Sequence, residues 1–324
     1  MKLRIAAIVA SSATILLIVT GCSVPSDTAG GGDSTAAPTR EIKKIFFSNI
    51  LPSYPPLAEA DKCFLAEAKK LGIEASTSGP TGLSTDNAKS IDLVSQAIAT
   101  GYDAIVMQPI DKAQFTPVME QAQAAGILLA TMNTGDTTDT QDFTIGTDYA
   151  IQGATIGEAI SKRSGQQNIG IIGNAPTGTH LLFTNGVKDG IESQKLDNVK
   201  FIVDAFDDGD PNKTVDVVNQ MLTAHPEINV VLSWQGLSAA GIMTAIKEKN
   251  VDGKIVGVTN DVTPEVAQGI KDGILFGTSK QNFCQMGIGA VDNLVAISKG
   301  EKVAKAIDSG ITFVTKDNID KESN

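Results

Sequence analysis

The chain has 324 residues, of which 42% are hydrophobic and 19% are charged, and this suits one or two globular domains with a substantial core. Its formal net charge of −11 argues against nucleic-acid binding, which needs a basic surface to neutralise phosphates. Only 2 His and 3 Cys are present, so we expect no metal and no cofactor.

The first 22 residues have the pattern of a bacterial lipoprotein signal. Lys2 and Arg4 precede an apolar run of about 15 residues, Ile5–Val19, which is short for a membrane span. The run ends in VTGC, which resembles a lipobox with conservative departures at its first two positions. We therefore predict a signal peptide over 1–22 and a lipid on Cys22. The alternative is an ordinary signal peptide with an incidental cysteine.

Residues 23–42 follow the signal and are mostly small, polar and rich in glycine. Such a segment cannot bury enough apolar area to order itself, so we expect a flexible tether. No later run is long and apolar enough to span a bilayer. The lipid and the tether together predict an extracytoplasmic protein that meets the membrane only through its anchor.

From Glu41 onward, short apolar runs alternate with amphipathic stretches. The apolar runs predict strands at Ile45–Ser48, Ile73–Thr77, Ala104–Met107, Leu128–Met132, Phe143–Gly146, Ile169–Ile172, Phe201–Ala205, Val230–Ser233, Ile255–Val258 and Leu275–Ser279. The amphipathic stretches predict helices at Leu57–Leu71, Ile91–Thr100, Phe115–Ala125, Ile151–Arg163, Val215–Ala224, Leu237–Lys249, Val266–Asp272 and Phe283–Ser298.

Buried strands that alternate with helices are typical of βαβ units and parallel sheets. The units form two similar groups, because TGYDAIVMQP at 100–109 resembles HPEINVVLSW at 225–234. We therefore predict an α/β chain with two doubly wound lobes, each built on a parallel sheet. In such folds a ligand binds at the carboxyl ends of the strands.

Neutral amides dominate the positions just after the predicted strands. The residues there are Asn49, Gln108, Asn133, Trp234, Gln235, Asn260, Asp261 and Gln281. Each amide offers both a donor and an acceptor, which suits a neutral polyhydroxylated ligand better than a phosphate or a cation. The alternative is that these side chains only cap their own loops.

Several single residues allow two interpretations. Trp234 is expected to stack on the apolar face of a sugar, or else to pack in the core beneath the cleft. Tyr54 lies among prolines and either contacts the ligand or packs against its loop. His180 is expected at a helix start that faces the cleft. Phe183 and Phe283 are weaker candidates, because a Phe at helical spacing is more often in a core.

The acidic run at 207–212 permits a calcium-loop interpretation. In such a loop the twelfth position needs a bidentate Glu, and counting from Asp208 places Asn219 there. We expect instead a helix that starts at Pro211, with Asp210 as its N-cap.

A set of phrases in the body resembles a known family. In chain order they are AEADKCFLAEAKKLGIEASTSGPT (58–81), GYDAIVMQPID (101–111), IGTDYAIQGATIGEAI (145–160), MLTAHPEINVVLSWQG (221–236), IVGVTNDVTPEVAQGIKDG (255–273) and FVTKDNID (313–320). In order and spacing they are similar to type I periplasmic substrate-binding proteins of bacterial ABC importers, above all the ribose, rhamnose and autoinducer-2 binding group. The resemblance runs from about residue 43 to residue 320.

This resemblance implies a clamp of the periplasmic-binding-protein-like I fold, with two lobes joined by a three-segment hinge. Matched onto this chain, the hinge crossings fall near Thr147-Asp148, Gln281-Asn282 and Ile311-Thr312. The implied N-terminal lobe is 43–147 plus 282–311, and the implied C-terminal lobe is 148–281 plus 312–324. Closure over a sugar-like molecule and docking on ABC permease subunits are implied as well, and we expect a monomer.

The resemblance also implies the ligand contacts. They are Asn49, Tyr54, Asn133, Phe183 in the first helix of the second lobe, Gln235, Asn260, Asp261 and Gln281, with Trp234 and His180 as further candidates. The ribose type has Asp-Arg where this chain has Asn133-Thr134, and it has an Arg near the place of Phe183. The autoinducer-2 type has Lys, Asp and Asp-Gln in place of Asn49, Asn133 and His180-Leu181. The less charged site favours a neutral sugar, deoxysugar or polyol.

Three other classes of protein share parts of this pattern. A lipid-anchored glycoside-processing enzyme would need paired carboxylates, and nothing marks two of Asp136, Asp148 and Asp261 as a pair. No nucleophile-elbow, zinc-protease, dinucleotide or P-loop sequence occurs, so we expect no enzyme. A sugar-responsive repressor would need a helix-turn-helix where the signal stands. A surface-anchored sensor partner with the same clamp stays open as an alternative to transport.

Two thiols remain in the secreted body once Cys22 is lipidated. Cys63 lies on the first predicted helix of the first lobe, and Cys284 follows the second matched crossing, where the chain returns to that lobe. In a doubly wound sheet these two helices can flank the same face, so we expect a Cys63–Cys284 disulfide. The alternative is two separate buried thiols.

Overall fold

The computed structural model describes residues 41–134, 140–249 and 253–323, all within one compact unit of the chain. The expected signal peptide, the lipidation site Cys22 and the tether up to residue 40 lie outside the described residues, as does Asp136.

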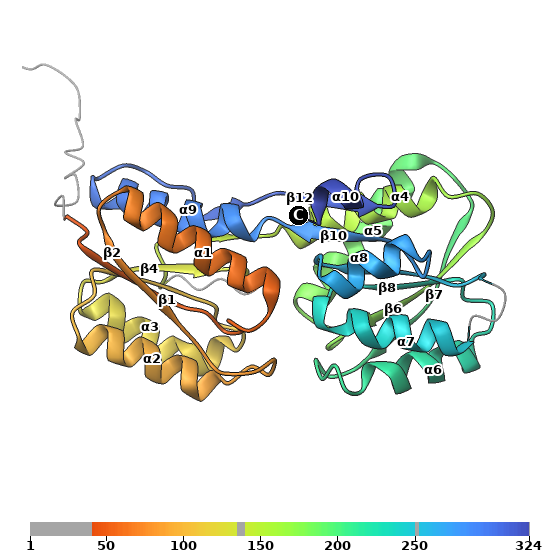
Figure 1. Ribbon diagram of the computed structural model, residues 1–324, viewed down its shortest axis with the longest axis horizontal. Coiled ribbons are helices and arrows are strands. Elements are labelled where there is room, and N and C mark those ends of the chain that lie inside the picture. The colour runs from red at the N-terminus through yellow and green to blue at the C-terminus, as the bar shows by residue number, and fades with distance from the viewer. Residues whose placement is uncertain (1–40, 135–139, 250–252, 324) are drawn as a thin grey trace, which may run out of the picture. The chain divides into compact units, whose positions relative to one another are not determined.

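The first lobe is built on a sheet that has six parallel strands within the described residues. They are β1 (Lys44–Ser48), β2 (Glu74–Ser78), β3 (Ala104–Met107), β4 (Leu128–Met132), β5 (Phe143–Gly146) and β11 (Ala306–Asp308), in the order β11-β5-β4-β3-β1-β2. One face of the sheet packs on α1 (Pro55–Lys70) and α9 (Phe283–Ser298), and the other packs on α2 (Asn87–Ala99) and α3 (Lys112–Ala124) (Figure 1). Because both faces are covered, strands such as β3 are buried along their whole length.

The second lobe has the same plan. Its described strands are β6 (Gln167–Gly173), β7 (Val199–Phe206), β8 (Val230–Ser233), β9 (Val256–Asn260), β10 (Leu275–Gln281) and β12 (Ile311–Thr315), in the order β12-β10-β9-β8-β6-β7. Its helices are α4 (Tyr149–Ser161), α5 (Thr179–Gln194), α6 (Thr214–Ala224), the short 3-10 turn η1 (Gly236–Ser238), α7 (Ala239–Lys249), α8 (Pro264–Lys271) and α10 (Ile319–Glu322). Helices α4 and α5 cover one face of the sheet, while α6 and α7 cover the other (Figure 1). The two strand orders correspond one to one, which confirms the predicted pair of doubly wound lobes.

Strand β12 differs from the all-parallel prediction, because it pairs antiparallel with β10. The chain leaves the carboxyl end of β11 in the first sheet, and only Ser309 and Gly310 separate that strand from β12 in the second sheet. It therefore enters the second sheet beside the carboxyl end of β10, where Gln281 pairs with Ile311, and runs back along that strand. A two-residue connection leaves no room for the long crossover that a parallel strand needs.

The chain passes between the two sheets at three places within the described residues. The first is Thr147-Asp148, between β5 and α4, and the second is Asn282, between β10 and α9. The third is Ser309-Gly310, two residues before the expected Ile311-Thr312, because Ile311 already pairs within the second sheet.

Helix α5 is absent from the helices predicted by apolar spacing, and its glycines explain why. Glycine lowers intrinsic helix propensity, and both Gly186 and Gly190 lie inside this helix. Tertiary packing requires them, because a Cβ on Gly186 would overlap the carbonyl oxygen of Ala150 on α4, and one on Gly190 would overlap that of Ala154. The two helix backbones are therefore packed directly against each other.

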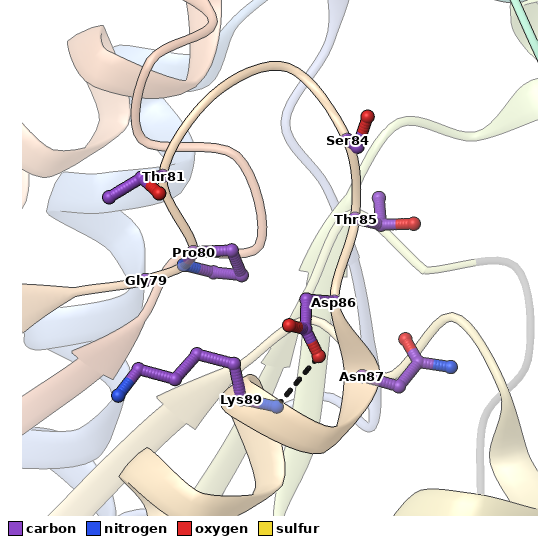
Figure 2. Close-up of a pocket in the computed structure, with 8 residues that line it drawn as sticks. All are labelled: Gly79, Pro80, Thr81, Ser84, Thr85, Asp86, Asn87 and Lys89. Atoms are coloured by element: carbon purple, nitrogen blue, oxygen red, sulfur yellow. Dashed lines mark hydrogen bonds between the residues drawn. The ribbon is translucent and has the colours of Figure 1, made fainter.

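The connection from β2 to α2 surrounds a surface hollow of about 620 Å³ (Figure 2). Helix α2 begins after Asp86, whose carboxylate accepts a 2.9 Å hydrogen bond from the Lys89 backbone N–H. This N-cap satisfies one of the unpaired amides of the first helical turn. The cap fixes the end of the connection. Thr85, which directly precedes Asp86, also lines a second cavity at the carboxyl ends of the two sheets.

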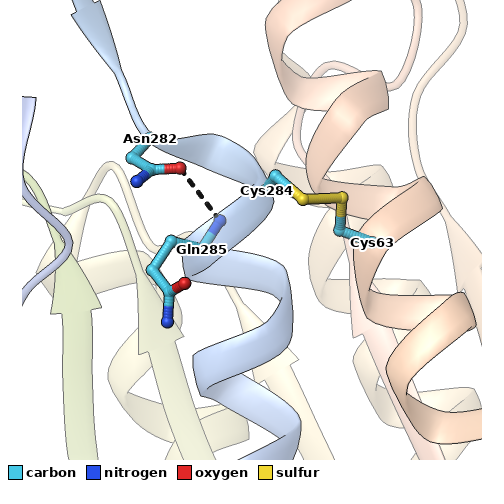
Figure 3. Close-up of a disulfide and its surroundings, with 4 residues drawn as sticks. All are labelled: Cys63, Asn282, Cys284 and Gln285. Carbon is cyan, nitrogen blue, oxygen red and sulfur yellow. Dashed lines mark hydrogen bonds between the residues drawn. A yellow bond between two sulfur atoms is a disulfide. The ribbon is translucent and has the colours of Figure 1, made fainter. Parts of the chain in front are cut away.

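A disulfide joins Cys63 of α1 to Cys284 of α9, with the two Cα atoms 5.2 Å apart (Figure 3). The bond lies two residues past the second crossing, where Asn282 caps α9 by accepting a hydrogen bond from the Gln285 backbone N–H at 3.2 Å. The cysteines are 221 positions apart, so the bond closes most of the chain into one loop. It thereby ties the returning helix to the first lobe.

Candidate ligand site between the lobes

A cavity of about 410 Å³ lies where the carboxyl ends of the two sheets meet, and we call it the interlobe cavity. It is lined by most of the residues expected to bind a ligand, namely Tyr54, Asn133, Trp234, Gln235, Asn260, Asp261 and Gln281. Tyr149 and Asn174 also line it and were not expected. Both could have been found from the sequence, because Tyr149 follows the first crossing and Asn174 directly follows β6. The site thus draws on both lobes.

Asn133 and Asp261 occupy corresponding places in the two lobes. Asn133 directly follows β4, and Asp261 directly follows β9, the strand that corresponds to β4 in the second sheet. Each has a positive φ, 47° for Asn133 and 65° for Asp261, and few residues other than glycine adopt this conformation. Backbone strain of this kind is typical of ligand-holding positions. The left-handed turn sets the direction in which each side chain leaves its strand.

The Asp261 carboxylate is buried, with 3% of the residue exposed, and both of its oxygens accept hydrogen bonds. Oδ2 accepts from the Tyr54 hydroxyl at 2.9 Å, and Oδ1 accepts from Gln281 Nε2 at 2.9 Å. Burial raises the pKa of Asp261 to about 6, and the bonds from Gln281 and Tyr54 oppose this shift. Within the described residues, both side-chain partners of the carboxylate, Tyr54 and Gln281, are neutral donors.

Tyr54 reaches from the first lobe to the second. It precedes α1, yet its hydroxyl bonds to Asp261 and lies against Gly236, where a Cβ would overlap the hydroxyl oxygen. Only glycine at position 236 permits this approach. Burial and the neighbouring Asp261 raise the pKa of Tyr54 well above its ordinary value, so the phenol stays protonated and donates. Its hydroxyl proton is thus committed to Asp261.

The side-chain amide oxygens of Asn260 and Asn133 accept hydrogen bonds from neighbouring groups. Asn260 Oδ1 accepts from Gln152 Nε2 at 2.8 Å and from Ser279 Oγ at 2.7 Å. Asn133 Oδ1 accepts longer bonds from the Thr147 backbone N–H at 3.4 Å and from the Tyr149 hydroxyl at 3.5 Å. With the oxygens engaged, each amide has its N–H₂ group left to donate to a ligand acceptor.

Gln235 and Trp234 carry polar atoms that have no hydrogen-bond partner within the described part of the chain. Gln235 Nε2 donates to Asp207 Oδ1 at 3.2 Å and to Ser238 Oγ at 3.0 Å, but its Oε1 is buried and unpaired. Trp234 Nε1 is likewise buried and unpaired, and its ring meets Tyr149 edge to face at 5.7 Å. A buried polar atom without a partner costs free energy, so each of these atoms is a candidate contact for a ligand in the cavity that both residues line.

The described wall of the cavity carries no positively charged side chain. Its described lining residues include no Lys, Arg or His. The two lining carboxylates are those of Asp261 and Asp208, and Asp208 is paired with Lys213 at 2.8 Å. A phosphate or a sugar acid would find no positive partner in this cavity.

Three of the expected ligand contacts do not line the cavity. The Asn49 side chain instead bonds to the backbone of the segment that follows it. It donates to the Leu57 carbonyl in the first turn of α1 at 3.1 Å and accepts from the Leu51 N–H at 2.9 Å. This is the loop-capping alternative for strand-end amides. Phe183 is fully buried in the core between α4 and α5, and α4 rather than α5 is the first helix of the second lobe.

His180 is also inside the second lobe rather than at the cleft, with 1% of the residue exposed. Its Nε2 lies 3.5 Å from Asp204 Oδ2, and its ring meets Phe206 edge to face at 5.1 Å. The position of α5 explains the difference: its first turn packs against β7, the neighbouring edge strand, so the side chain turns inward.

The acidic run does not form the helix start that was expected. Helix α6 begins at Thr214, not at Pro211, and Asp210 accepts from the Asn212 N–H in a turn before it. Asp207, the first residue of the run, is buried inside the lobe. In the described ranges, no three His, Cys, Asp or Glu residues are arranged to hold a metal ion. The helices described there also include none that could span a membrane.

Comparisons with known proteins agree with this geometry. The sequence profile of a family described as "Periplasmic binding protein domain" matches residues 47–302. The D-ribose/D-allose-binding protein of Pseudomonas aeruginosa is 26% identical over 225 residues, which cover 67% of this chain and 70% of that protein. The ribose import binding protein RbsB of Salmonella typhimurium is 27% identical over 232 residues, which cover 71% of this chain and 77% of that protein.

A similar solved structure is that of an ABC transporter solute-binding protein from Burkholderia graminis in complex with D-arabinose. It is 25% identical, its TM-score is 0.74, and the match covers 87% of this chain and 98% of that one. The expectation that the chain is not an enzyme is also met, since these relatives and neighbours are binding proteins of transporters.

Proposed function

The chain belongs to the periplasmic binding protein family, and on that basis we propose that it captures a neutral sugar, deoxysugar or polyol between its lobes and delivers it to an ABC permease. The observation that carries the proposal is the interlobe cavity, in which amides and aromatic rings from both lobes converge without a cation. Such a wall can hydrogen-bond many hydroxyls and cover the apolar face of a ring.

Each lobe supplies part of the recognition. In our proposal Asn133 of the first lobe and Asn260 of the second donate to ligand oxygens, while Gln235 accepts from a ligand hydroxyl. Trp234 donates through its indole N–H and lies beside the apolar face of the ring. A ligand that satisfies groups on both sides stabilises the arrangement in which the lobes hold it.

We also propose that the protein acts outside the cytoplasm as a monomer held to the membrane by a lipid on Cys22. Residues 23–41 would then act as the tether, one residue shorter than expected, because Ile42 is buried in the core of the first lobe. The observation behind this is the charged, apolar and VTGC pattern of the first 22 residues. A Cys22→Ser variant should incorporate no labelled lipid, whereas undiminished incorporation would exclude this anchor.

A thermal-shift screen of the chain from residue 41 onward tests the ligand proposal. The panel contains D-ribose, D-allose, D-arabinose, D-fucose and xylitol, with glucose 6-phosphate and gluconate as anionic controls. A bound ligand raises the melting temperature by mass action, by a few degrees at about 100 times its Kd. We expect a shift with at least one neutral compound and none with the anions. A shift with the anions alone would overturn the assignment.

A further inference from the structure

We propose that Asp207, which does not line the interlobe cavity, fixes which end of the Gln235 amide faces the ligand. Under this assignment Gln235 presents its oxygen, so this position accepts a hydrogen bond from the ligand and rejects a ligand atom that can only accept. The inference rests on the proposed function, because it names a residue that sets the specificity of the same site.

Asp207 is fully buried, and its carboxylate receives four hydrogen bonds from neutral donors. Oδ2 accepts from Thr214 Oγ1 at 2.8 Å and from Ser238 Oγ at 2.9 Å. Oδ1 accepts from the Gly209 backbone N–H at 3.0 Å and from Gln235 Nε2 at 3.2 Å. An ionised carboxylate has about four lone-pair sites and no proton to donate. Asp207 can therefore face only the N–H₂ end of the Gln235 amide.

Ser238 imposes the same orientation by an independent route. Its single hydroxyl proton is donated to Asp207 Oδ2, so toward Gln235 the hydroxyl can only accept. Gln235 Nε2 donates to it at 3.0 Å. If the amide turned over, its oxygen would face an oxygen of Asp207 and an oxygen of Ser238, with no proton available between them.

The remaining atom of the amide is the one available to a ligand. Gln235 Oε1 is buried and has no hydrogen-bond partner in the described ranges, and Gln235 lines the cavity. The adjacent Trp234 offers only a donor, its Nε1. A free ligand hydroxyl can donate to Oε1, and a ligand oxygen can accept from the indole N–H. An ether or methoxy oxygen would leave Oε1 unpaired, which is costly in a buried site.

An exchange of charge between the two positions tests the orientation without any ligand. Gln235→Glu sets a carboxylate against Asp207 and should lower the melting temperature by roughly 5–10 °C. Adding Asp207→Asn should restore most of this loss, since the new amide donates to Glu at position 235. The matched control is Asp210→Asn, in the same loop, whose carboxylate bonds to Asn212 and not to Gln235. It should restore nothing.

Calorimetry with D-ribose, D-allose and D-arabinose on the full-length protein tests the consequence for the site. Asp207→Asn alone lets the amide turn and should weaken binding at least about tenfold. The double variant again presents an oxygen and should bind within about threefold of the wild type. A double variant as weak as the single one, or Gln235→Glu as stable as the wild type, would overturn the assignment. If the wild type binds none of these sugars, the titrant is the neutral compound of the thermal-shift panel that most stabilises it. If it binds no neutral compound of that panel, the proposed function fails, while the stability exchange still decides the role of Asp207.

Discussion

The Tyr54 hydroxyl lies 2.9 Å from Asp261 Oδ2, and this hydrogen bond joins the first lobe to the second. Asp261 also accepts from Gln281 Nε2, and Gln281 Oε1 in turn accepts from Thr147 Oγ1 at 2.7 Å. Thr147 belongs to the first crossing, and Gln281 directly precedes the second. The cavity-lining carboxylate of Asp261 is thus connected by side chains to two of the crossings on which any relative movement of the lobes depends.

Tyr54→Phe removes the donor of this interlobe bond and leaves a buried carboxylate with one partner fewer. We expect the protein to lose about 1–3 kcal/mol of unfolding free energy at pH 8, where Asp261 is ionised. At pH 5 the protonated carboxyl needs the donor less, so the loss should be smaller. Urea unfolding at the two pH values measures both.

Tyr102→Phe provides the matched control, because it also removes a tyrosine hydroxyl bond, that to Ser76 Oγ at 2.7 Å, away from the cavity. Its effect should not change between the two pH values. Equal pH dependence in both variants would contradict the role given to Tyr54.

Stability should depend on pH through Asp261. Its folded-state pKa is raised to about 6, so between pH 4 and pH 6 the native state binds more protons than the unfolded chain. The unfolding free energy should therefore fall as pH rises through this window, by up to about 3 kcal/mol from this group. Asp261→Asn should remove this part of the slope.

Asp61 on α1 adds a second contribution of the same sign, since burial raises its pKa to about 6 as well. A residual slope is therefore expected in Asp261→Asn. The exposed Asp317→Asn provides the control and should keep the full slope. A profile of Asp261→Asn that parallels the wild type would show that Asp261 does not titrate in this range.

The contact between α4 and α5 should tolerate no side chain at Gly186. A valine there must displace the Ala150 carbonyl of α4, and overpacking of this kind costs about 1–3 kcal/mol or more. Because α4 carries Tyr149 and Gln152 toward the site, sugar affinity should fall too. Asn185→Val, on the exposed side of the same helix, controls for the helix propensity of valine. A Gly186→Val protein as stable as this control would refute the close packing.

The Cys63–Cys284 bond predicts that the denatured, unreduced body from residue 41 contains no free thiol. Two free thiols on titration would rule the bond out. A double Cys63→Ser, Cys284→Ser variant should lose up to about 5 kcal/mol of unfolding free energy, because the long loop is then open in the unfolded chain. Reduction of the wild type should reproduce that loss, while the double variant should not respond to the reductant.

The sequence predicted the fold well where burial decided the pattern. Runs such as Ala104–Met107 and Val230–Ser233 are strands with the predicted bounds, because parallel strands covered on both faces must be apolar throughout. Strands β11 and β12 were missed, since they are short, partly exposed and set by the crossing between the sheets. Apolar spacing did not predict helix α5, because packing, not propensity, places its glycines.

The candidate site was predictable only in part. Asn133, Gln235 and Asp261 were predicted as site residues from their positions at strand ends. The topology alone brings the carboxyl ends of the strands together, and all three residues line the cavity. His180 was expected at a helix start that faces the cleft, and the packing of α5 turns it inward. Asp207 was interpreted only as part of the acidic run before a helix start, and no pattern of neighbouring residues revealed that it bonds to Gln235.

Calorimetry on one variant from each lobe tests the central claim most directly. Asn133→Ala removes an amide of the first lobe, and Gln235→Ala removes one of the second. The titrant is the sugar or polyol that most stabilises the wild type. We predict one-to-one binding that each substitution weakens about ten- to a hundredfold, because a buried polar group then loses its partner. If both variants bind within about twofold of the wild type, the ligand does not bind between the lobes as proposed.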